Sequence, residues 1–145
     1  MKKIFALLAF VGCGIALANA DPQAAHKSGK DNSMISTVIH VNFSDSERQG
    51  HGLKNVVNIL KEVPNAKVEV VCHGAGISLL VQGDTKHADK VQELIGNGVS
   101  FVACENTLKD KSIPKDKLLA GVTTVPTGAV EIVSKQREGY SYFKP

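Results

Sequence analysis

Five short runs rich in β-branched and apolar residues alternate along this chain with stretches in which apolar residues recur at helical spacing. The runs cover residues 35–43, 67–72, 99–103, 122–125 and 140–144. Their length and composition are typical of β-strands. The pattern therefore predicts five strands separated by helices.

The stretches between these runs place apolar residues three and four positions apart, as on one face of an α-helix. These residues are Leu53, Val56, Val57, Leu60 and Val63, then Ala88, Val91, Leu94 and Ile95, and, less regularly, Val130, Ile132 and Val133. Strands that alternate with crossover helices form mainly parallel sheets. We therefore expect one α/β domain with a mainly parallel five-stranded sheet and helices on both faces. Residues 77–83 fit either a helical turn or a short extra strand.

The first 33 residues differ from the rest of the chain. Lys2 and Lys3 precede an apolar run over residues 4–17, and Ala18-Asn19-Ala20 has the small-residue pattern of a signal-peptidase site. We expect residues 1–20 to be a signal peptide cleaved after Ala20, residues 21–33 a flexible polar leader, and residues 34–145 the domain. This predicts export to a bacterial periplasm. Lipid attachment at Cys13 is the alternative fate of the leader.

The charge balance excludes some partners. The chain has 17 Lys and Arg against 14 Asp and Glu, a formal charge of +3 that falls to +1 when Lys2 and Lys3 are removed. So little excess basic charge makes nucleic acid an unsuitable partner. Because no second apolar segment of about 20 residues follows the signal, we expect no membrane span.

Candidate reactive groups follow the predicted strands, where parallel sheets gather their binding loops. Cys104 ends the third strand and precedes residues 105–111, which resemble a first helical turn. Backbone N–H groups at a helix start favour a thiolate, so Cys104 is a candidate nucleophile or sulfur carrier. Asn106 and Thr107 would supply hydrogen bonds there. The alternative is that Cys104 fills a small space in the core.

His73 opens a second candidate loop, with the sequence His73-Gly74-Ala75-Gly76. It could take the proton of Cys104, and Gly74 and Gly76 would let a ligand approach the backbone. All three could equally serve only the turn.

Other residues near the predicted strand ends receive lesser roles. Thr127 and Gly128 follow the fourth strand and complete the candidate site. We interpret His40 as a core or rim histidine, His51 as a residue at the mouth of the site, and His87 as a solvated surface residue.

Cys72 opens two alternatives of another class. In an oxidising periplasm it could form a disulfide with Cys104, although a strand order of 2-1-3 would hold the two strands about 9.6 Å apart. With His73, His40 and Cys104 it could instead bind copper(I) or zinc. The chain has no C-x-x-C, phosphate-loop, dinucleotide-binding or serine-hydrolase motif, so we expect no cofactor and no metal.

The strings VEVVCHGAGISLL, GVSFVACENTLK and VPTGAVEIVSKQREGYSYFKP together resemble the DsrE/DsrF-like family of small sulfur-relay proteins, in its exported branch. The likeness covers about residues 35–145, and A-C-x-N-T is its most specific part. The resemblance implies a flavodoxin-like domain, assembly as a homotrimer or homohexamer, and Cys104 as a persulfide carrier.

These observations favour a periplasmic protein that binds or relays sulfane sulfur, with a donor or acceptor protein or a small sulfur anion as its partner. The alternatives are a non-catalytic oligomeric binding module and a soft-metal protein. Ile77, Leu79, Leu80 and Val81 form an apolar run that a monomer would leave partly uncovered, which also favours an oligomer. Four lysines, with two aspartates between them, form a solvated face or steer an anion to Cys104; they are Lys109, Lys111, Lys115 and Lys117.

The leader generates the first testable prediction. N-terminal sequencing of the exported protein should start at Asp21, because the Ala18-Asn19-Ala20 site precedes it. A mature protein that starts at a lipid-modified Cys13 would contradict this prediction and place the domain on a membrane surface.

Overall fold

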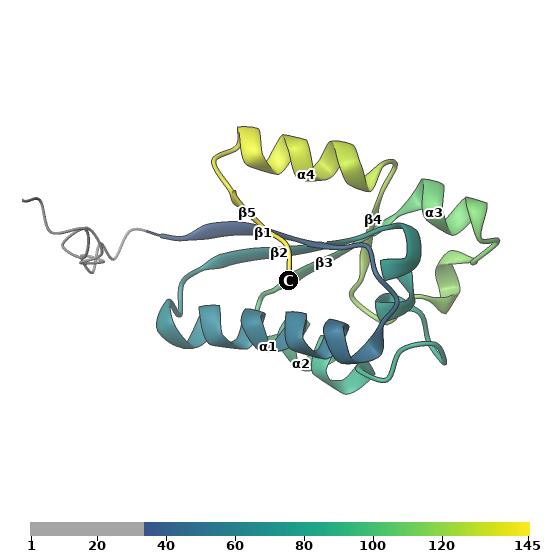
Figure 1. Cartoon of the computed structure of the whole chain (residues 1–145), viewed down its shortest axis with the longest axis horizontal. Coiled ribbons are helices and arrows are strands. Elements are labelled where there is room, and N and C mark those ends of the chain that lie inside the picture. The colour runs from purple at the N-terminus through teal and green to yellow at the C-terminus, as the bar shows by residue number, and fades with distance from the viewer. Residues whose placement is uncertain (1–33) are drawn as a thin grey trace, which may run out of the picture. The chain divides into compact units, whose positions relative to one another are not determined.

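Five parallel strands form one sheet in the computed structural model, which describes residues 34–145 (Figure 1). The expected signal peptide and leader, residues 1–33, lie outside the described residues. The strands are β1 (Ser36–Val41), β2 (Lys67–Cys72), β3 (Ser100–Cys104), β4 (Thr123–Val125) and β5 (Ser141–Phe143). All four pairings are parallel, in the order β4-β3-β2-β1-β5.

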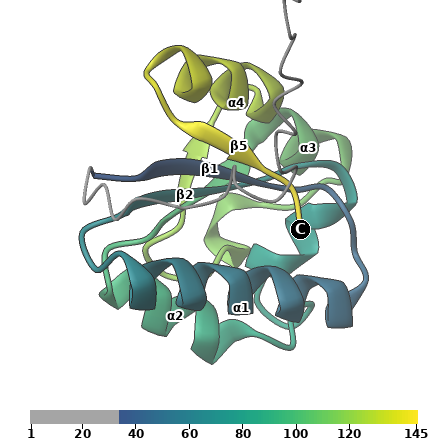
Figure 2. The ribbon, with the colours of Figure 1, turned by 60° about the vertical axis from the view of Figure 1, so that its left-hand side comes forward.

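Helices cover both faces of this sheet, so the expected fold class is confirmed. The α-helices are α1 (Ser46–Glu62), α2 (Ala88–Gly96), α3 (Glu105–Asp110) and α4 (Gly128–Arg137), and the 3₁₀ helices are η1 (Gly74–Leu80) and η2 (Lys115–Lys117). Helices α1 and α2 lie on one face and α4 lies on the other (Figures 1 and 2). No helix in residues 34–145 is long and apolar enough to cross a membrane.

The strand order differs from the order 2-1-3 considered for the disulfide. Strands β1 to β4 follow one another across the sheet, and β5 lies on the far side of β1. The connection from β1 to β2 therefore crosses one face of the sheet through α1, and the connection from β4 to β5 crosses the opposite face through α4. Such a switch point, at the carboxyl ends of the strands, is where open α/β sheets bind ligands.

Helix α1 begins earlier than its apolar positions indicate. The side chain of Asp45 accepts a hydrogen bond of 2.7 Å from the N–H of Arg48 and caps the helix at Ser46. His51 is consequently an exposed residue within α1, which lies on the face of the sheet opposite α4 (Figure 1), and our placement of it at the mouth of the site is wrong.

The core has two parts of unequal size. The larger part includes Leu53 and Val56 of α1 and Leu94 of α2, packed against the sheet. The smaller part, on the α4 face, consists of Val38, Val71, Val102 and Ile132. Helix α4 therefore rests on few apolar contacts, and it leaves Val130 and Val133 with 61% and 54% of their surface exposed.

Residues 77–83 form most of η1 and a single antiparallel bridge between Val81 and Leu118. Ile77, Leu79, Leu80 and Val81 are at most 5% exposed, because η1 packs against β2, β3, α2 and α3. The expectation that a monomer leaves this run uncovered is therefore wrong. Among the described residues the exposed apolar side chains include Val130, Val133, Tyr142 and Phe143.

Candidate functional site

Strand periodicity aligns three chemically active side chains on the α4 face. Val38, Val71 and Val102 belong to β1, β2 and β3 and contribute to the small core under α4. Side chains two residues apart along a strand lie on the same face. The next residues on this face are His40, His73 and Cys104, which therefore form a row along the carboxyl ends of three adjacent strands.

Cys104 ends β3 and precedes α3, as the sequence predicted. It also lies against the start of α4, because a β-carbon added to Gly128 would stand 3.2 Å from the Cβ atoms of both Cys104 and His73. Gly128 thus lets the backbone of α4 approach the thiol closely. The side chain of Cys104 is 4% exposed.

The surroundings of Cys104 favour its charged form. Burial by itself raises the pKa of this thiol, but the backbone of Gly128, the backbone and hydroxyl of Thr107 and the backbone of Asn106 lower it by hydrogen bonding, and the net pKa lies below the ordinary value. Thr107 accepts a 2.9 Å hydrogen bond from the N–H of Gly74, so its own hydroxyl proton remains available to the sulfur.

Asn106 joins the two helix starts that surround Cys104. Its side-chain N–H donates to the Thr127 hydroxyl at 3.2 Å, and its backbone N–H donates to the carbonyl of Pro126 at 3.2 Å. Thr127 is the residue immediately before α4. The residues predicted around Cys104 are therefore brought together, with Asn106 and Thr127 acting as supports.

Cys72 belongs to a different environment. It pairs with Ala103 and lies in the larger core, on the face opposite Cys104. Both thiols are free, and burial with no exposed surface raises the pKa of Cys72. The disulfide alternative is therefore wrong. The structure also separates Cys72 from His73, His40 and Cys104, the residues considered with it for a soft metal, and within residues 34–145 no three His, Cys, Asp or Glu side chains are grouped so as to hold a metal ion.

A chain of hydrogen-bonding groups extends from His73 toward the sheet edge. Nε2 of His73 lies 2.6 Å from Nε2 of His40, and Nδ1 of His40 lies 2.8 Å from the hydroxyl of Tyr142 on β5. Sequence reasoning assigned His40 only a core or rim role and missed Tyr142. The role of His40 could have been predicted from the alternation along the strand, which puts Val38 and His40 on one face. The contact with Tyr142 could not, because it also depends on the pairing of β5 with β1.

Both histidines are held in the neutral form. Burial, then His73 and then Lys144 lower the pKa of His40 to about 4, and burial followed by Lys144 lowers the pKa of His73. Lys144 comes two residues after Tyr142 and places a positive charge near both rings. At neutral pH each imidazole therefore has one N–H and one acceptor nitrogen.

The two glycines predicted beside His73 differ in role. Gly74 adopts a positive φ of 56°, its N–H donates to Thr107, and a β-carbon added there would meet nothing within 4 Å beyond its chain neighbours. A β-carbon on Gly76 would stand 2.2 Å from the carbonyl oxygen of Val41. Gly76 therefore serves the packing of η1 on β1, and the close approach there is by the chain's own backbone.

Two surface expectations are also resolved. His87 is not simply solvated, because its Nε2 lies 2.7 Å from the carbonyl of Ser46 and its ring packs over Gly50. In the lysine run, Lys115 pairs with Glu105 and contacts Thr124. All four lysines are exposed, which favours a solvated face.

The family model of the DsrE/DsrF-like family matches residues 22–145. The chain belongs to this family. No curated protein matches it. A protein of unknown function from Methanobacterium thermoautotrophicum, MTH1491, is similar in structure, with a TM-score of 0.74, 34% identity, and coverage of 77% of this chain and 99% of that one.

Two more distant structures share the fold of this DsrE/DsrF-like domain. The ychN protein of E. coli has a TM-score of 0.66 and 15% identity, with 77% of this chain and 100% of that chain covered. The conserved protein of unknown function BT1422 from Bacteroides thetaiotaomicron has a TM-score of 0.64 and 14% identity, with 76% and 94% covered.

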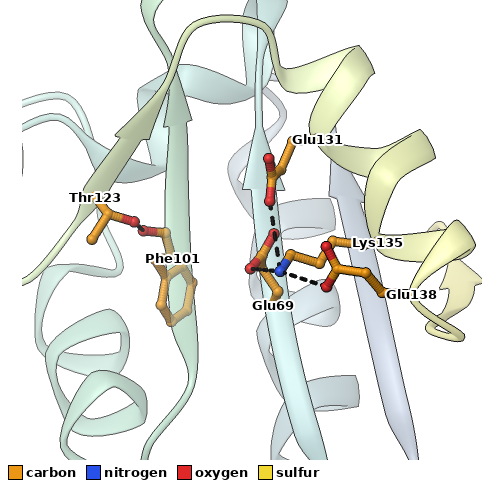
Figure 3. Close-up of polar contacts among 6 residues, drawn as sticks. All are labelled: Glu69, Phe101, Thr123, Glu131, Lys135 and Glu138. Carbon is orange, nitrogen blue, oxygen red and sulfur yellow. Dashed lines mark hydrogen bonds and ion pairs between the residues drawn. The ribbon is translucent and has the colours of Figure 1, made fainter.

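An ion cluster holds the second half of α4 on the sheet of this DsrE/DsrF-like domain (Figure 3). Nζ of Lys135 lies 3.7 Å from a carboxylate oxygen of Glu69, 3.8 Å from one of Glu131 and 3.1 Å from one of Glu138. Glu69 on β2 is 8% exposed. Burial raises the pKa of Glu69 to about 7, against the opposing effect of Lys135 and with a further increase from Glu131.

Glu69 should therefore make stability depend on pH. The folded protein retains a proton that the unfolded chain releases above pH 4.5, so the free energy of unfolding should fall as pH rises from 4.5 to about 7, by at most about 1.4 kcal/mol per pH unit. Glu69→Gln should flatten this slope in urea titrations. Glu62→Gln, at an exposed position of α1, should keep it; equal slopes in the two variants would contradict the assignment.

The two cysteines should differ sharply in reactivity. In the folded protein, Cys104 should be alkylated by iodoacetamide faster than Cys72 and from a lower pH, because hydrogen bonds lower the pKa of Cys104 and burial raises that of Cys72. Peptide mass spectrometry across a pH series measures both rates in one sample. Labelling of both thiols only after unfolding would show that Cys104 is a packing residue.

Proposed function

We propose that this protein carries sulfane sulfur as a persulfide on Cys104. Membership of the DsrE/DsrF-like family supports a role in sulfur relay. The observation that carries the proposal is the set of backbone and hydroxyl donors from Gly128, Thr107 and Asn106, which stabilises negative charge on one sulfur atom. The thiolate is the form of a cysteine that attacks a persulfide or thiosulfate.

The reaction is transfer of one sulfur atom between thiols. The Cys104 thiolate attacks the outer sulfur of a donor persulfide, a new S–S bond forms, the old one breaks, and the donor leaves as a thiolate. With thiosulfate as donor the leaving group is sulfite. An acceptor thiolate then takes the outer sulfur and regenerates the Cys104 thiolate. Each step balances without an external oxidant or reductant.

Because Cys104 is nearly buried, a sulfur donor or acceptor has to approach it at the carboxyl ends of the strands. A donor or acceptor protein, or a small sulfur anion, fits this requirement. Export to the periplasm, on the strength of residues 1–20, is part of the proposal. The same 4% exposure is the observation that favours the alternative, a non-catalytic binding module in which Cys104 only packs.

Intact-mass analysis tests the proposal. The mature protein exposed to glutathione persulfide or thiosulfate should gain one sulfur atom that a reductant removes. Cys104→Ser should abolish the gain, whereas Cys72→Ser, the matched control in the larger core, should retain it. If Cys72→Ser lost the mass gain and Cys104→Ser kept it, Cys72 would be the sulfur carrier and the proposal would be wrong. No mass gain in the wild-type protein would favour the binding module.

We also propose that the protein assembles as a homotrimer or homohexamer. Val130 and Val133 on α4 and Tyr142 and Phe143 on β5 are exposed apolar side chains that a second copy would cover. Light scattering at micromolar concentration should return a multiple of the chain mass. Val130→Lys combined with Val133→Lys should lower it, and a monomer mass in the wild type would contradict the proposal.

A further inference from the structure

Helix α4 is held on the sheet by two kinds of contact. Its two buried residues are Gly128, in the first turn, and Ile132, which it contributes to the small core. Its second half lies over Glu69 of β2 and carries the other members of the ion cluster (Figure 3), which are Glu131, Lys135 and Glu138. Because the apolar contact is small, the charge of Glu69 affects how firmly α4 rests on β2.

Glu69 has few partners as an ion. The residue is 8% exposed, and its Oε1 atom has no hydrogen-bond partner among the described residues. Its neighbours on β1 and β3 are Val38 and Ser100, which carry no charge. The counter-charge is Lys135 at 3.7 Å, and its Nζ atom is shared with two further carboxylates of α4. Burial of the ionised carboxylate is therefore costly, and burial of the neutral acid costs less.

The neutral form of Glu69 is also the form that fits beside Glu131. Burial raises the pKa of Glu69 to about 7 against the effect of Lys135, with further increases from the charge of Glu131 and from a hydrogen bond between the two carboxyl groups. An ionised carboxylate only accepts hydrogen bonds, so this bond needs one proton in the pair. Loss of that proton leaves two like charges side by side under α4.

The other end of α4 lies at the thiol. Gly128 comes seven residues before Lys135, about 10 Å away along one helix. The hydrogen bond from its backbone has the largest lowering effect on the pKa of Cys104. A β-carbon added to Gly128 would stand 3.2 Å from the Cβ of Cys104, so the packing of α4 places this donor. A shift of the helix would move the donor with it.

We infer that Glu69 and Lys135 are positioning residues for Cys104, on which they act through α4. While Glu69 is neutral, α4 rests on β2 and the Gly128 N–H meets the sulfur. When Glu69 releases its proton to solvent, the cluster gains one negative charge, the second half of α4 loosens and the Gly128 donor withdraws.

This inference rests on the proposed function only in taking Cys104 as the reacting group. The contact with Glu69 is on the inner side of α4, whereas Val130 and Val133 are exposed. A second copy that covers those two valines would leave the contact in place.

The titrations of the two groups oppose each other. Rising pH favours the Cys104 thiolate, while ionisation of Glu69 raises the pKa of Cys104 by removing a hydrogen-bond donor. The wild-type thiol should therefore titrate over a wider pH range than a single isolated group does.

Ultraviolet absorbance of the thiolate tests this without any sulfur donor. The signal of Cys104 is the difference between each protein and the same protein with Cys104→Ser. Glu69→Gln cannot ionise and keeps a donor toward Glu131, so its thiol should titrate as a single group. Above about pH 7 its ratio of thiolate to thiol should exceed that of the wild type by about threefold, the effect of losing part of one hydrogen bond to a charged group. The matched control is Glu62→Gln, at an exposed acid of α1, and it should titrate like the wild type.

Hydrogen exchange of the α4 amides in the wild-type protein is a second measurement, which no variant's failure to fold can affect. Corrected for the intrinsic pH dependence of exchange, the protection of α4 relative to α1 should fall as the pH passes about 7, and in Glu69→Gln it should stay constant.

Constant relative protection of α4 in the wild type, or identical Cys104 titrations in the wild type and folded Glu69→Gln, would overturn the inference. A mass gain at Cys104 with identical titrations would leave the proposed function standing without it. Different titrations without a mass gain would support the inference and contradict the proposed function.

Discussion

The close approach of α4 to the end of β3 is the contact on which the candidate site depends. Gly128 has no side chain, and the space where a β-carbon would stand lies 3.2 Å from the Cβ atoms of Cys104 and His73. Helix α3 begins at the residue after Cys104 and supplies donors from that side of the sulfur only. The N–H of Gly128 reaches the sulfur because α4 packs against the end of β3. A larger residue at position 128 would separate the helix from both reactive side chains at once.

The two ends of α4 have opposite electrostatic character. Its first turn stabilises negative charge on Cys104, while its second half covers Glu69, where burial disfavours the charged form. Lys135 offsets part of that cost through its ion pair with Glu69, and it also pairs with Glu131 and Glu138. Because the apolar cluster under α4 is small, this ionic contact contributes to the position of the whole helix. The geometry at the thiol is thereby linked to a buried acid at the other end of the strands.

Strand order explains why the remaining functional groups meet. β5 returns to the sheet beside β1, so residues near the end of the chain lie beside residues near its beginning: Tyr142 contacts His40, although 102 positions separate them. The main-chain oxygen of Pro145 accepts hydrogen bonds from Arg48 on α1 at 3.2 and 2.7 Å. These bonds anchor the last residues, and with them Lys144, close to the two histidines.

The five strands, the crossover helices and the place of Cys104 between a buried strand and a helix start could be predicted from the sequence, because these depend on local patterns of apolar and polar residues. The sequence did not determine that Cys72 and Cys104 lie on opposite faces of neighbouring strands, that η1 buries residues 77–81, or that His40, His73 and Tyr142 form one chain of contacts. Each of these depends on which strands are neighbours and which face each helix covers. Strand pairing and helix packing join residues distant in sequence, and local patterns of apolar and polar residues do not encode the order in which the strands assemble.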